Sequence, residues 1–393
     1  MEILKLWKNS RKPLKSFFNM YKTNILYPPY PLAGRGFSLV KYYHSKKFVK
    51  KEALMHIPEN YLSPATCAVM TAAMVPVWAH SVKKVKEELP KDKIAMVGVG
   101  AAFSFLGMMF NVPLVGGTTG HAVGGTLIAL LFGPEAACLG VSIALLLQAL
   151  IFGDGGILSF GANCFNMAFI LPFVGYGVYK LIAGKGTDAK PGRIYAGAAI
   201  GSYIGICLAA LFCAVEFGIQ PLIAHDAAGN ALYCPYGLDI AIPAMMIPHM
   251  AVAGVIEAAF TVAVYAFVRK TSPDLTYDSI RLGAHAETGK GHAPVFALAA
   301  ILIAATPLGL LATGTAWGEW GADEIAEISE TGAPLGYTPQ GMVDGFSMEA
   351  PMPDYTLGEV NEVAAYILSA VIGTALLVII FKLLSNALRG KNA

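Results

Sequence analysis

Histidines are the side chains of this 393-residue chain best suited to chemistry, because a neutral imidazole binds transition-metal ions at physiological pH. There are eight of them, and two stand apart from the rest. His56 precedes a proline-marked turn, and His121 lies in the glycine-rich string VGGTTGHAVGG (115–125), whose backbone can fold closely around a small object. For the other six we expect ordinary structural roles: His44, His80, His225, His249, His285 and His292.

His56 gains a further possibility if the protein begins at Met55. The free amine of Met55, the backbone nitrogen of His56 and its imidazole could then chelate one cation through fused five- and six-membered rings. One more imidazole would complete four nitrogens in a plane, which suits Ni(II) or Cu(II), whereas Zn(II) prefers a tetrahedron. The run KEALM (51–55) can be encoded as a purine-rich ribosome-binding sequence followed closely by ATG. We therefore predict that translation starts at Met55.

The composition places these residues in a membrane protein. Hydrophobic residues make up 55% of the chain and charged residues 14%, against about 25% charged in a typical soluble chain, and the mean hydropathy is +0.57. The 42 glycines suit close helix packing in a bilayer. The six cysteines lack a repeated CxxC spacing, which argues against a disulfide framework and against a zinc cluster. We therefore expect an all-α polytopic protein of the cell membrane.

Apolar stretches indicate where the chain crosses the membrane. About nine of them run near 64–82, 94–111, 121–133, 136–152, 162–182, 194–217, 240–268, 293–312 and 363–386. The third stretch is too short to cross by itself, and a glycine-rich loop precedes it. We expect the chain to dip into the bundle there, because irregular backbone at membrane depth needs protein or a cavity around it.

The charged residues between these stretches alternate in sign. Loops 83–93, 183–193 and 269–292 contain Lys or Arg. Segment 313–362 contains ten acids and no Lys or Arg. The positive-inside rule then puts the Met55 end outside and the C-terminus in the cytoplasm. Residues 1–54 carry 12 of the 28 Lys and Arg and only two acids, so they would lie on the wrong side if they were made. The alternative to a mis-assigned start is a solvated basic tail, which would lie on anionic lipid.

The domain organisation follows from these segments. Residues 1–54 are a basic N-terminal extension. Residues 55–268 form a compact bundle of about seven helices, and residues 269–292 form a polar cytoplasmic linker. Residues 293–393 form a two-helix hairpin with a long acidic external loop.

Three separated strings resemble the CbiM/NikM proteins, which are the substrate-capture (S) components of energy-coupling-factor importers for cobalt and nickel. The strings are MHIPENYLSP (55–64), GGTTGHAVGGT (116–126) and QALIFGDGGILSFGANCFNM (148–167). The resemblance covers about 55–268, and family members begin at the Met-His dipeptide. The hairpin 293–393, with AATPLGLLATGTAWGEWG (304–321) and APMPDY (350–355), is similar to the small accessory subunit of the CbiN/NikN type.

The resemblance implies a metal site and its surroundings. Met55 and His56 would supply the N-terminal ligands and His121 the remaining imidazole, in a square-planar site of four nitrogens. Related cobalt proteins often have His where this chain has Asp154, which would orient a ligand, steer the cation or cap the next turn. Asn60 and Asn163 would hydrogen-bond the binding loop, or only satisfy buried backbone.

The first apolar stretch also suggests an interface. Its Ala68-x-x-x-Ala72 pattern permits close approach of another helix. In S components this helix tends to face the membrane-embedded coupling subunit, so the resemblance implies that role. The alternative is ordinary packing inside the chain.

Polar groups in or beside the spans offer another function. Gln148, Glu216, His249 and Glu257 would line a proton or cation path in a stand-alone secondary transporter or channel. His249 and Glu257 are eight residues apart, about two helical turns, so they could share a face, although we expect such pairs more often to join helices. A membrane enzyme is disfavoured by the lack of HExxH-type spacing.

The energy for transport is expected to come from other subunits. GAHAETGKG (283–291) has the wrong spacing for a phosphate loop, and no other stretch fits better. The chain is therefore expected to be no enzyme but a transport subunit, working with a coupling membrane subunit and two ATPase subunits. We expect no bound cofactor and no nucleic-acid partner. The transported ligand would be Ni(II) or Co(II), and the planar site and Asp154 favour nickel.

Overall fold

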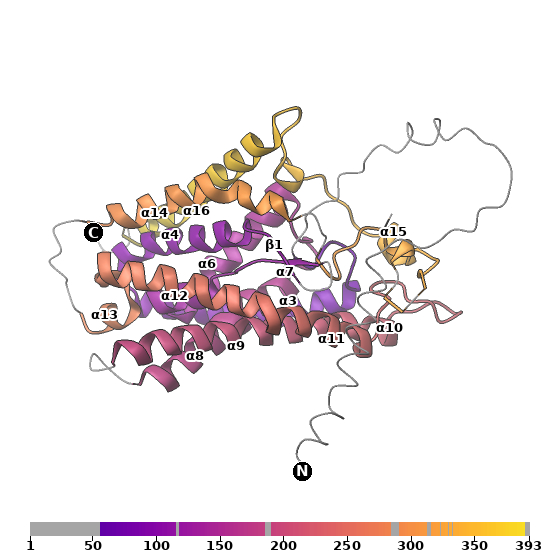
Figure 1. The fold of residues 1–393 in the computed structure, drawn as a ribbon, viewed down its shortest axis with the longest axis horizontal. Coiled ribbons are helices and arrows are strands. Elements are labelled where there is room, and N and C mark those ends of the chain that lie inside the picture. Colours follow the sequence, from indigo (N-terminus) through magenta and orange to yellow (C-terminus); the bar gives the residue numbers. More distant parts are fainter. Residues whose placement is uncertain are drawn as a thin grey trace, which may run out of the picture. The chain divides into compact units, whose positions relative to one another are not determined.

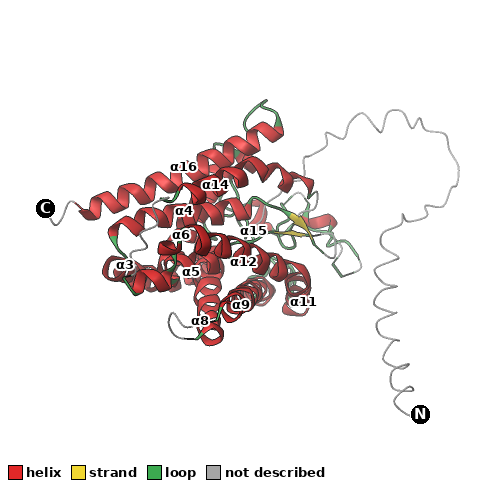
Figure 2. Ribbon diagram, turned by 60° about the vertical axis from the view of Figure 1, so that its left-hand side comes forward, coloured by secondary structure: helices red, strands yellow, loops and turns green. Residues whose placement is uncertain are grey.

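The computed structural model describes residues 56–389 except 115–117, 185–189, 284–290, 313–315, 323, 329 and 332, and these described residues belong to one compact unit. Met55, the basic extension 1–54, and parts of the linker and of the acidic loop lie outside the described residues. Nearly all regular structure in the described part is helical, as Figure 2 shows. Figure 1 gives the arrangement of its elements.

Seven helical segments within the described residues are long and apolar enough to cross a membrane. They are Pro64–Glu88, Pro134–Phe152, Phe160–Ala183, Pro191–Ile223, Leu238–Thr271, Ala293–Leu311 and Glu362–Ala387. Three of these contain a π-helical turn, which ends the first at Gln148–Phe152 and lies inside the other two at Cys164–Ile170 and His249–Ala253. The fold is therefore that of an all-α polytopic membrane protein, as the composition predicts.

The individual helices follow in chain order. They are α3 (Pro64–Glu88), α4 (Lys91–Met108), α5 (Gly125–Phe132), α6 (Pro134–Leu147), α7 (Phe160–Asn163), α8 (Leu171–Ala183), α9 (Pro191–Gly218), α10 (Gln220–Ile223), α11 (Leu238–Pro248), α12 (Gly254–Thr271), α13 (Tyr277–Arg281), α14 (Ala293–Ala305), α15 (Gln340–Val343) and α16 (Glu362–Arg389). Short 3₁₀ turns occur at Pro273–Leu275, Thr306–Leu311, Ile325–Glu327 and Pro353–Tyr355. Strands β1 (Val112–Pro113) and β2 (Thr119–Gly120) pair antiparallel, with Val112 opposite Gly120.

Helix α4 lies at the centre of the bundle, and its small residues let neighbours come close. Nearly every residue from Val97 to Met108 is buried. A Cβ atom on Gly98 would lie 2.9 Å from the Cβ atom of Phe381 on α16. The C-terminal helix therefore packs directly on the core helix of the preceding bundle, by the small-residue contact that membrane helices favour.

Helix α5 is fully buried along its eight residues. It follows the loop that carries His121 and runs inside the bundle, surrounded by α4, α6, α8 and α12. The short apolar stretch at 121–133 thus enters the protein interior, where its irregular approach is shielded from lipid.

Helix α3 lies at the periphery. Ser63 caps its N-terminus, because the backbone N–H of Thr66 donates to the Ser63 Oγ at 3.3 Å. Of its 25 residues only Thr66, Cys67, Met74 and Ser81 are buried. More than half of the helix, including Ala68, Val69 and Ala72, is exposed on the outside of the described residues.

Candidate metal centre

The chain enters the bundle through a buried N-terminal segment, residues 56–63. His56 is 2% exposed, and Ile57, Tyr61 and Leu62 are also buried. The Ile57 peptide is held from both sides by one amide: its N–H donates to Asn163 Oδ1 at 3.0 Å, and Asn163 Nδ2 donates to its carbonyl at 3.1 Å. Such pairing fixes the backbone on either side of Ile57, the residue that follows His56.

The loop 153–159 completes this clamp. The N–H of Gly156 and the hydroxyl of Ser159 both donate to the carbonyl of Ile57, at 2.9 and 2.7 Å. A Cβ atom on Gly155 (φ +91°) would lie 2.9 Å from the Cβ of His56. Glycine is therefore required where this loop approaches the His56 side chain.

Glu59 ties the same segment again to the loop 153–159, and Asn60 ties it to one further loop. The Glu59 carboxylate accepts from the N–H of Ile157 at 2.6 Å and of Leu158 at 3.2 Å. Burial raises the pKa of Glu59, and these backbone hydrogen bonds act against that rise. Asn60, at a left-handed φ of 60°, donates from Nδ2 to the carbonyl of Phe346 at 2.8 Å. Asn60 thus joins the segment to the loop before α16.

His56 and His121 meet in the interior. Their ring centroids lie 5.4 Å apart with the planes at 69°, and both residues are buried. His56 Nδ1 lies 2.8 Å from Asp154 Oδ1, and the ring donates to this carboxylate. His56 Nε2 is buried without a hydrogen-bond partner among the described residues. The two imidazoles therefore meet where at least one ring nitrogen is available.

Asp154 is the anchor of the His56 ring. It is 2% exposed, and burial by itself would raise its pKa, but the attraction and hydrogen bond of His56 together with the Tyr355 hydroxyl hold the pKa below its usual value. Tyr355 Oη donates to Asp154 Oδ2 at 2.5 Å. Gln148 Nε2 donates to the Tyr355 hydroxyl at 2.9 Å and to Asp154 Oδ2 at 3.3 Å. Asp154 therefore contacts His56 directly and does not act only as a cap.

Tyr355 belongs to the C-terminal hairpin and was not predicted from the sequence. It sits in a tight turn, with φ 52° at Asp354 and 59° at Tyr355, and Ser369 Oγ donates to its carbonyl at 3.1 Å. Its ring stacks on Phe152 at a centroid distance of 4.8 Å. The signal in the sequence was the string APMPDY, which marks the accessory hairpin but does not say where its tyrosine points.

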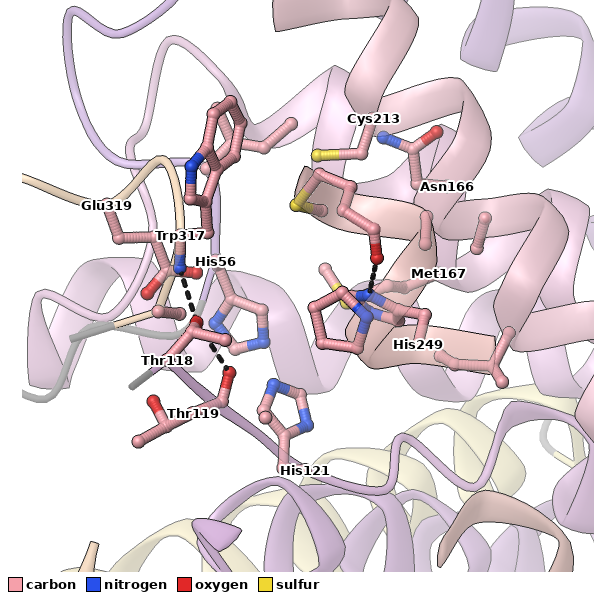
Figure 3. A pocket seen from close by; sticks show the side chains of 18 of the residues that line it. His56, Thr118, Thr119, His121, Asn166, Met167, Cys213, His249, Trp317 and Glu319 are labelled. Atoms are coloured by element: carbon pink, nitrogen blue, oxygen red, sulfur yellow. Dashed lines mark hydrogen bonds between the residues drawn. The ribbon is translucent and has the colours of Figure 1, made fainter. Parts of the chain in front are cut away.

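A pocket opens beside the two imidazoles (Figure 3). Side chains from six parts of the chain line it, among them His56, Thr118, His121, Asn166, Met167, Cys213, Met245, His249, Trp317 and Glu319. Thr118 holds the hairpin loop in place, because the N–H of Trp317 donates to its Oγ1 at 2.8 Å. Glu319 follows on that loop and is 8% exposed; burial raises the pKa of its carboxyl, and repulsion by Asp154 raises it further.

The other polar residues singled out in the sequence have separate places. Glu257 accepts from the N–H of Val123 at 2.7 Å and of Gly124 at 3.1 Å, so it fixes the loop that follows His121. Glu216 accepts from Asn166 Nδ2 at 2.9 Å. His249 lines the pocket, and its Nδ1 donates to the carbonyl of Met245 at 2.7 Å.

The remaining histidines lie away from this pocket. His225 is exposed beside Asp226, His80 lies 3.9 Å from Glu135, and His292 lies 2.9 Å from Asp274. His44 and His285 are outside the described residues. Among the described residues, no three His, Cys, Asp or Glu side chains are grouped so as to hold a metal ion. Side chains of these four types therefore do not complete a site around the two imidazoles in this part of the chain.

A polytopic helical bundle in which two buried imidazoles lie 5.4 Å apart beside a pocket defines a membrane protein suited to a transition-metal ion. Residues 56–275 match the CbiM family, described as the cobalt uptake substrate-specific transmembrane region, and residues 292–390 match the PDGLE domain. The chain belongs to the CbiM family, with a PDGLE domain in the same chain. The resemblance drawn from the three sequence strings is thereby confirmed.

Relatives with both parts are similar along most of the chain. The probable fused nickel transport protein LarMN of Lactiplantibacillus plantarum is 48% identical over 337 residues, which cover 85% of this chain and 98% of that protein. The fused nickel transport protein NikMN of Rhodobacter capsulatus is 45% identical and covers 82% and 95%. A crystal structure of a transition metal transporter is 49% identical with a TM-score of 0.52, over 60% of this chain and all of that one.

Proposed function

We propose that the protein is the substrate-capture subunit of an energy-coupling-factor importer for Ni(II), with Co(II) as the alternative cargo. The observation that carries this proposal is the meeting of His56 and His121, 5.4 Å apart, at the end of a clamped and buried N-terminal segment. His56 follows Met55 directly in the sequence, so the backbone nitrogen of His56 and the Met55 amine lie beside its imidazole. The site consists of the Met55 amine, the His56 backbone nitrogen and imidazole, and the His121 imidazole.

The donor set is supported by what surrounds the two rings. In the part of the chain that the structure describes, no three His, Cys, Asp or Glu side chains are grouped so as to hold a metal ion, which is compatible with donors from the backbone and from a terminal amine. A terminal amine exists at this place only when the chain starts at Met55. The family match begins at residue 56, and the alignment with LarMN covers 98% of that protein but 85% of this chain, which supports that start.

The fused chelate requires a movement of His56. A six-membered ring through the backbone nitrogen closes on Nδ1, and Nδ1 is hydrogen-bonded to Asp154 in this structure. The imidazole therefore turns about its Cβ–Cγ bond when the chelate forms, and it releases the Asp154 carboxylate. Asp154 holds the ring ready near His121 while no cation is present.

Nickel is favoured over cobalt by the proposed geometry and by the relatives. Four nitrogens in a plane suit Ni(II). Two relatives that cover most of this chain are named nickel transport proteins, while more distant CbiM relatives are named cobalt transport proteins. Because nitrogen sites bind Ni(II) more tightly than Co(II) in general, the cargo has to be decided by uptake in competition.

The orientation is supported by which segments meet. At one end of the bundle Lys93 donates to Asp274 at 2.6 Å, and Tyr277 donates to Glu88 at 3.2 Å, so the basic loop 83–93 lies against segment 269–281. Figure 1 shows α13 at this end and α10 and α15 at the opposite end. The first end is cytoplasmic by the positive-inside rule, and the metal pocket opens outside.

The exposed face of α3 supports the proposed partner subunits. Ala68 and Ala72 are both exposed on the peripheral helix α3, together with Val75. This face takes the coupling membrane subunit, and two ATPase subunits bound to that subunit supply the energy. This chain neither hydrolyses ATP nor holds a resident cofactor.

The first test is a calorimetric titration with Ni(II) of two purified chains, one starting at Met55 and the other with all 393 residues. We expect tight one-to-one binding in the shorter chain alone. Equal binding by both chains would show that the terminal amine is not a ligand.

Two substitutions test the ligands themselves. His121→Ala removes one of the four nitrogens, and His56→Ala also opens a chelate ring, so we expect both to weaken Ni(II) binding, the second more severely. Each loss should exceed the roughly 10- to 100-fold that changes in residues behind a ligand produce. His225→Ala, in an exposed loop, is the matched control and should bind as the wild type does. An unchanged dissociation constant for His56→Ala or His121→Ala would contradict the site.

A further inference from the structure

Glu319 is a buried carboxylate that the proposed ligand set does not use. It lies on the loop between α14 and α16 and lines the same pocket as His56 and His121. Figure 3 shows its side chain on the side of the pocket where His56 and Thr118 lie. Only 8% of the residue is exposed. The fused hairpin therefore places an acid in the pocket of the preceding domain.

This carboxylate lacks a partner among the described residues. Glu319 Oε2 is buried without a hydrogen bond, and no ion pair to the side chain occurs in the described part of the chain. The segment 313–362, on which it lies, contains no Lys or Arg at all. A buried carboxyl group without a donor or a cation is costly to ionise, and a cation that enters the pocket lowers that cost.

The position of Glu319 is fixed by its own loop. The N–H of Glu319 donates to the carbonyl of Ala316 at 3.2 Å, and the neighbouring Trp317 is hydrogen-bonded to Thr118, three residues before His121. The Trp317 ring packs in a T-shaped arrangement against Trp320, at 5.6 Å. The acid is thus attached to the His121 loop through backbone contacts, and it does not lie on a free surface.

A nitrogen atom without a hydrogen-bond partner among the described residues lies on another residue that lines this pocket. His56 Nε2 faces the same pocket without a hydrogen bond among the described residues. Carboxylate oxygen suits a hydrated divalent cation, whereas imidazole suits nickel once water has left. One pocket thus holds an oxygen donor, which suits the hydrated cation, and two imidazoles, which suit the cation after it has lost water.

We propose that Glu319 is a metal-contacting residue that receives the incoming hydrated divalent cation before the cation passes to His56 and His121. The inference rests on the proposed function and adds a step to it. A Glu319 oxygen replaces one water of the arriving ion, and the nitrogens then replace the oxygen, so no carboxylate remains bound in the final planar site. The accessory hairpin thereby contributes directly to metal capture.

The test is stopped-flow association of Ni(II) with the wild type and with Glu319→Gln. Both chains include the hairpin. Both start at the residue whose chain binds Ni(II) in the calorimetric titration described above. At about 0.15 M ionic strength, where long-range attraction is screened, we expect Glu319→Gln to slow association about tenfold. The dissociation rate and the visible spectrum of the loaded site should not change, which also shows that the variant is folded.

The matched control is Glu327→Gln, which removes the same charge from an exposed position of the same loop. It should leave association within about twofold of the wild type, because its charge is screened by solvent. Equal slowing by both variants would mean that the acidic loop attracts the cation through its overall charge and not through a contact with Glu319. That result would overturn the inference.

The remaining outcomes separate the two proposals. If Ni(II) binding depends on His56 but Glu319→Gln associates at the wild-type rate, the inference fails and the proposed function stands. If the wild type does not bind Ni(II), the proposed function fails and the inference fails with it.

Discussion

At the scale of single residues, the pocket is defined by a chain of hydrogen bonds that crosses from one part of the sequence to another. Tyr355 donates to Asp154, and Asp154 holds the His56 ring, with distances of 2.5 and 2.8 Å. The atoms are buried, so these charge-assisted bonds are short and are not exchanged with water. Tyr355 therefore acts on His56 through Asp154 and is a positioning residue.

Tyr355→Phe tests that role, because it removes the hydroxyl and keeps the ring that stacks on Phe152. With the hydroxyl gone, Asp154 loses a donor and the His56 ring loses its fixed orientation. We expect the dissociation constant for Ni(II) to rise about tenfold, by calorimetry.

Tyr337→Phe is the control for this variant. Tyr337 lies on the same hairpin loop, and its hydroxyl accepts from the N–H of Ala231 at 3.2 Å, away from the pocket. It should retain wild-type affinity. If Tyr355→Phe also binds like the wild type, Tyr355 is not a positioning residue.

The sequence identifies the residues within the first bundle better than those from the hairpin. His56, His121, Asp154 and Asn163 stand in strings whose glycines and spacing are unusual, and the structure brings them together. Whether they bind metal stays a prediction. Tyr355 lies 201 residues from its partner Asp154, and no periodic pattern reports a contact at that separation.

At the scale of elements, helices α7 and α3 pack closely together at a glycine. Helix α7 approaches α3 so closely that a Cβ atom on Gly161 would lie 2.2 Å from Thr71 Oγ1 and 2.5 Å from the Thr71 Cα. Helix α7 follows the loop that clamps the segment after His56. The packing of α7 on α3 therefore sets the position of that loop.

Gly161→Ala forces these helices apart, since the added methyl group meets backbone as well as side chain. We expect it to lower the free energy of unfolding by about 1–3 kcal/mol, as overpacking does, measured by thermal unfolding in detergent. Gly177→Ala on α8 is the control, because nothing lies within 4 Å of the added atom. That variant should be unchanged or more stable by up to about 1 kcal/mol. Equal effects of the two substitutions would contradict the packing argument.

Substitutions on the outward face of α3 are expected to affect partner binding and not stability. Ala68→Leu with Ala72→Leu enlarges an exposed small-residue face, so Ni(II) affinity and stability should stay within about 0.5 kcal/mol of wild type. Co-purification with the coupling membrane subunit should fall, because bulk at this face keeps the partner helix away. Val69→Leu, exposed one position further round the helix, should co-purify normally. Undiminished co-purification of the double variant would move the interface elsewhere.

Hydropathy predicts where the helices lie in the sequence, but it does not predict how far each helix is buried inside the protein. Hydropathy finds both α3 and α4, yet α4 is almost wholly buried and α3 is mostly exposed. The difference lies in partners, since α16 covers α4 from the far end of the sequence. An apolar run is compatible with lipid and with protein alike, so hydropathy alone does not separate these two environments.

At the scale of the whole molecule, two buried carboxylates of the bundle accept hydrogen bonds from neighbouring groups, which disfavours a path for a coupling ion. Glu257 holds the backbone of Val123 and Gly124, and Glu216 accepts from Asn166. A proton or cation path needs groups that exchange ligands in sequence across the membrane. These carboxylates instead fix the loops and helices around the pocket.

We therefore expect vesicles that contain this chain alone to bind Ni(II) without accumulating it, under either a proton or a sodium gradient. Vesicles that also hold the coupling subunit and both ATPase subunits should accumulate Ni(II) when ATP is supplied on the side of the membrane where the ATPase subunits lie. The measurement is uptake of radioactive Ni(II), with a hydrolysis-deficient ATPase as the control. Gradient-driven accumulation by this chain alone, abolished by Glu257→Gln, would instead make it a secondary transporter. The fixed contacts of Glu257 argue against that result, because a group that holds two backbone N–H donors is not free to pass a cation along.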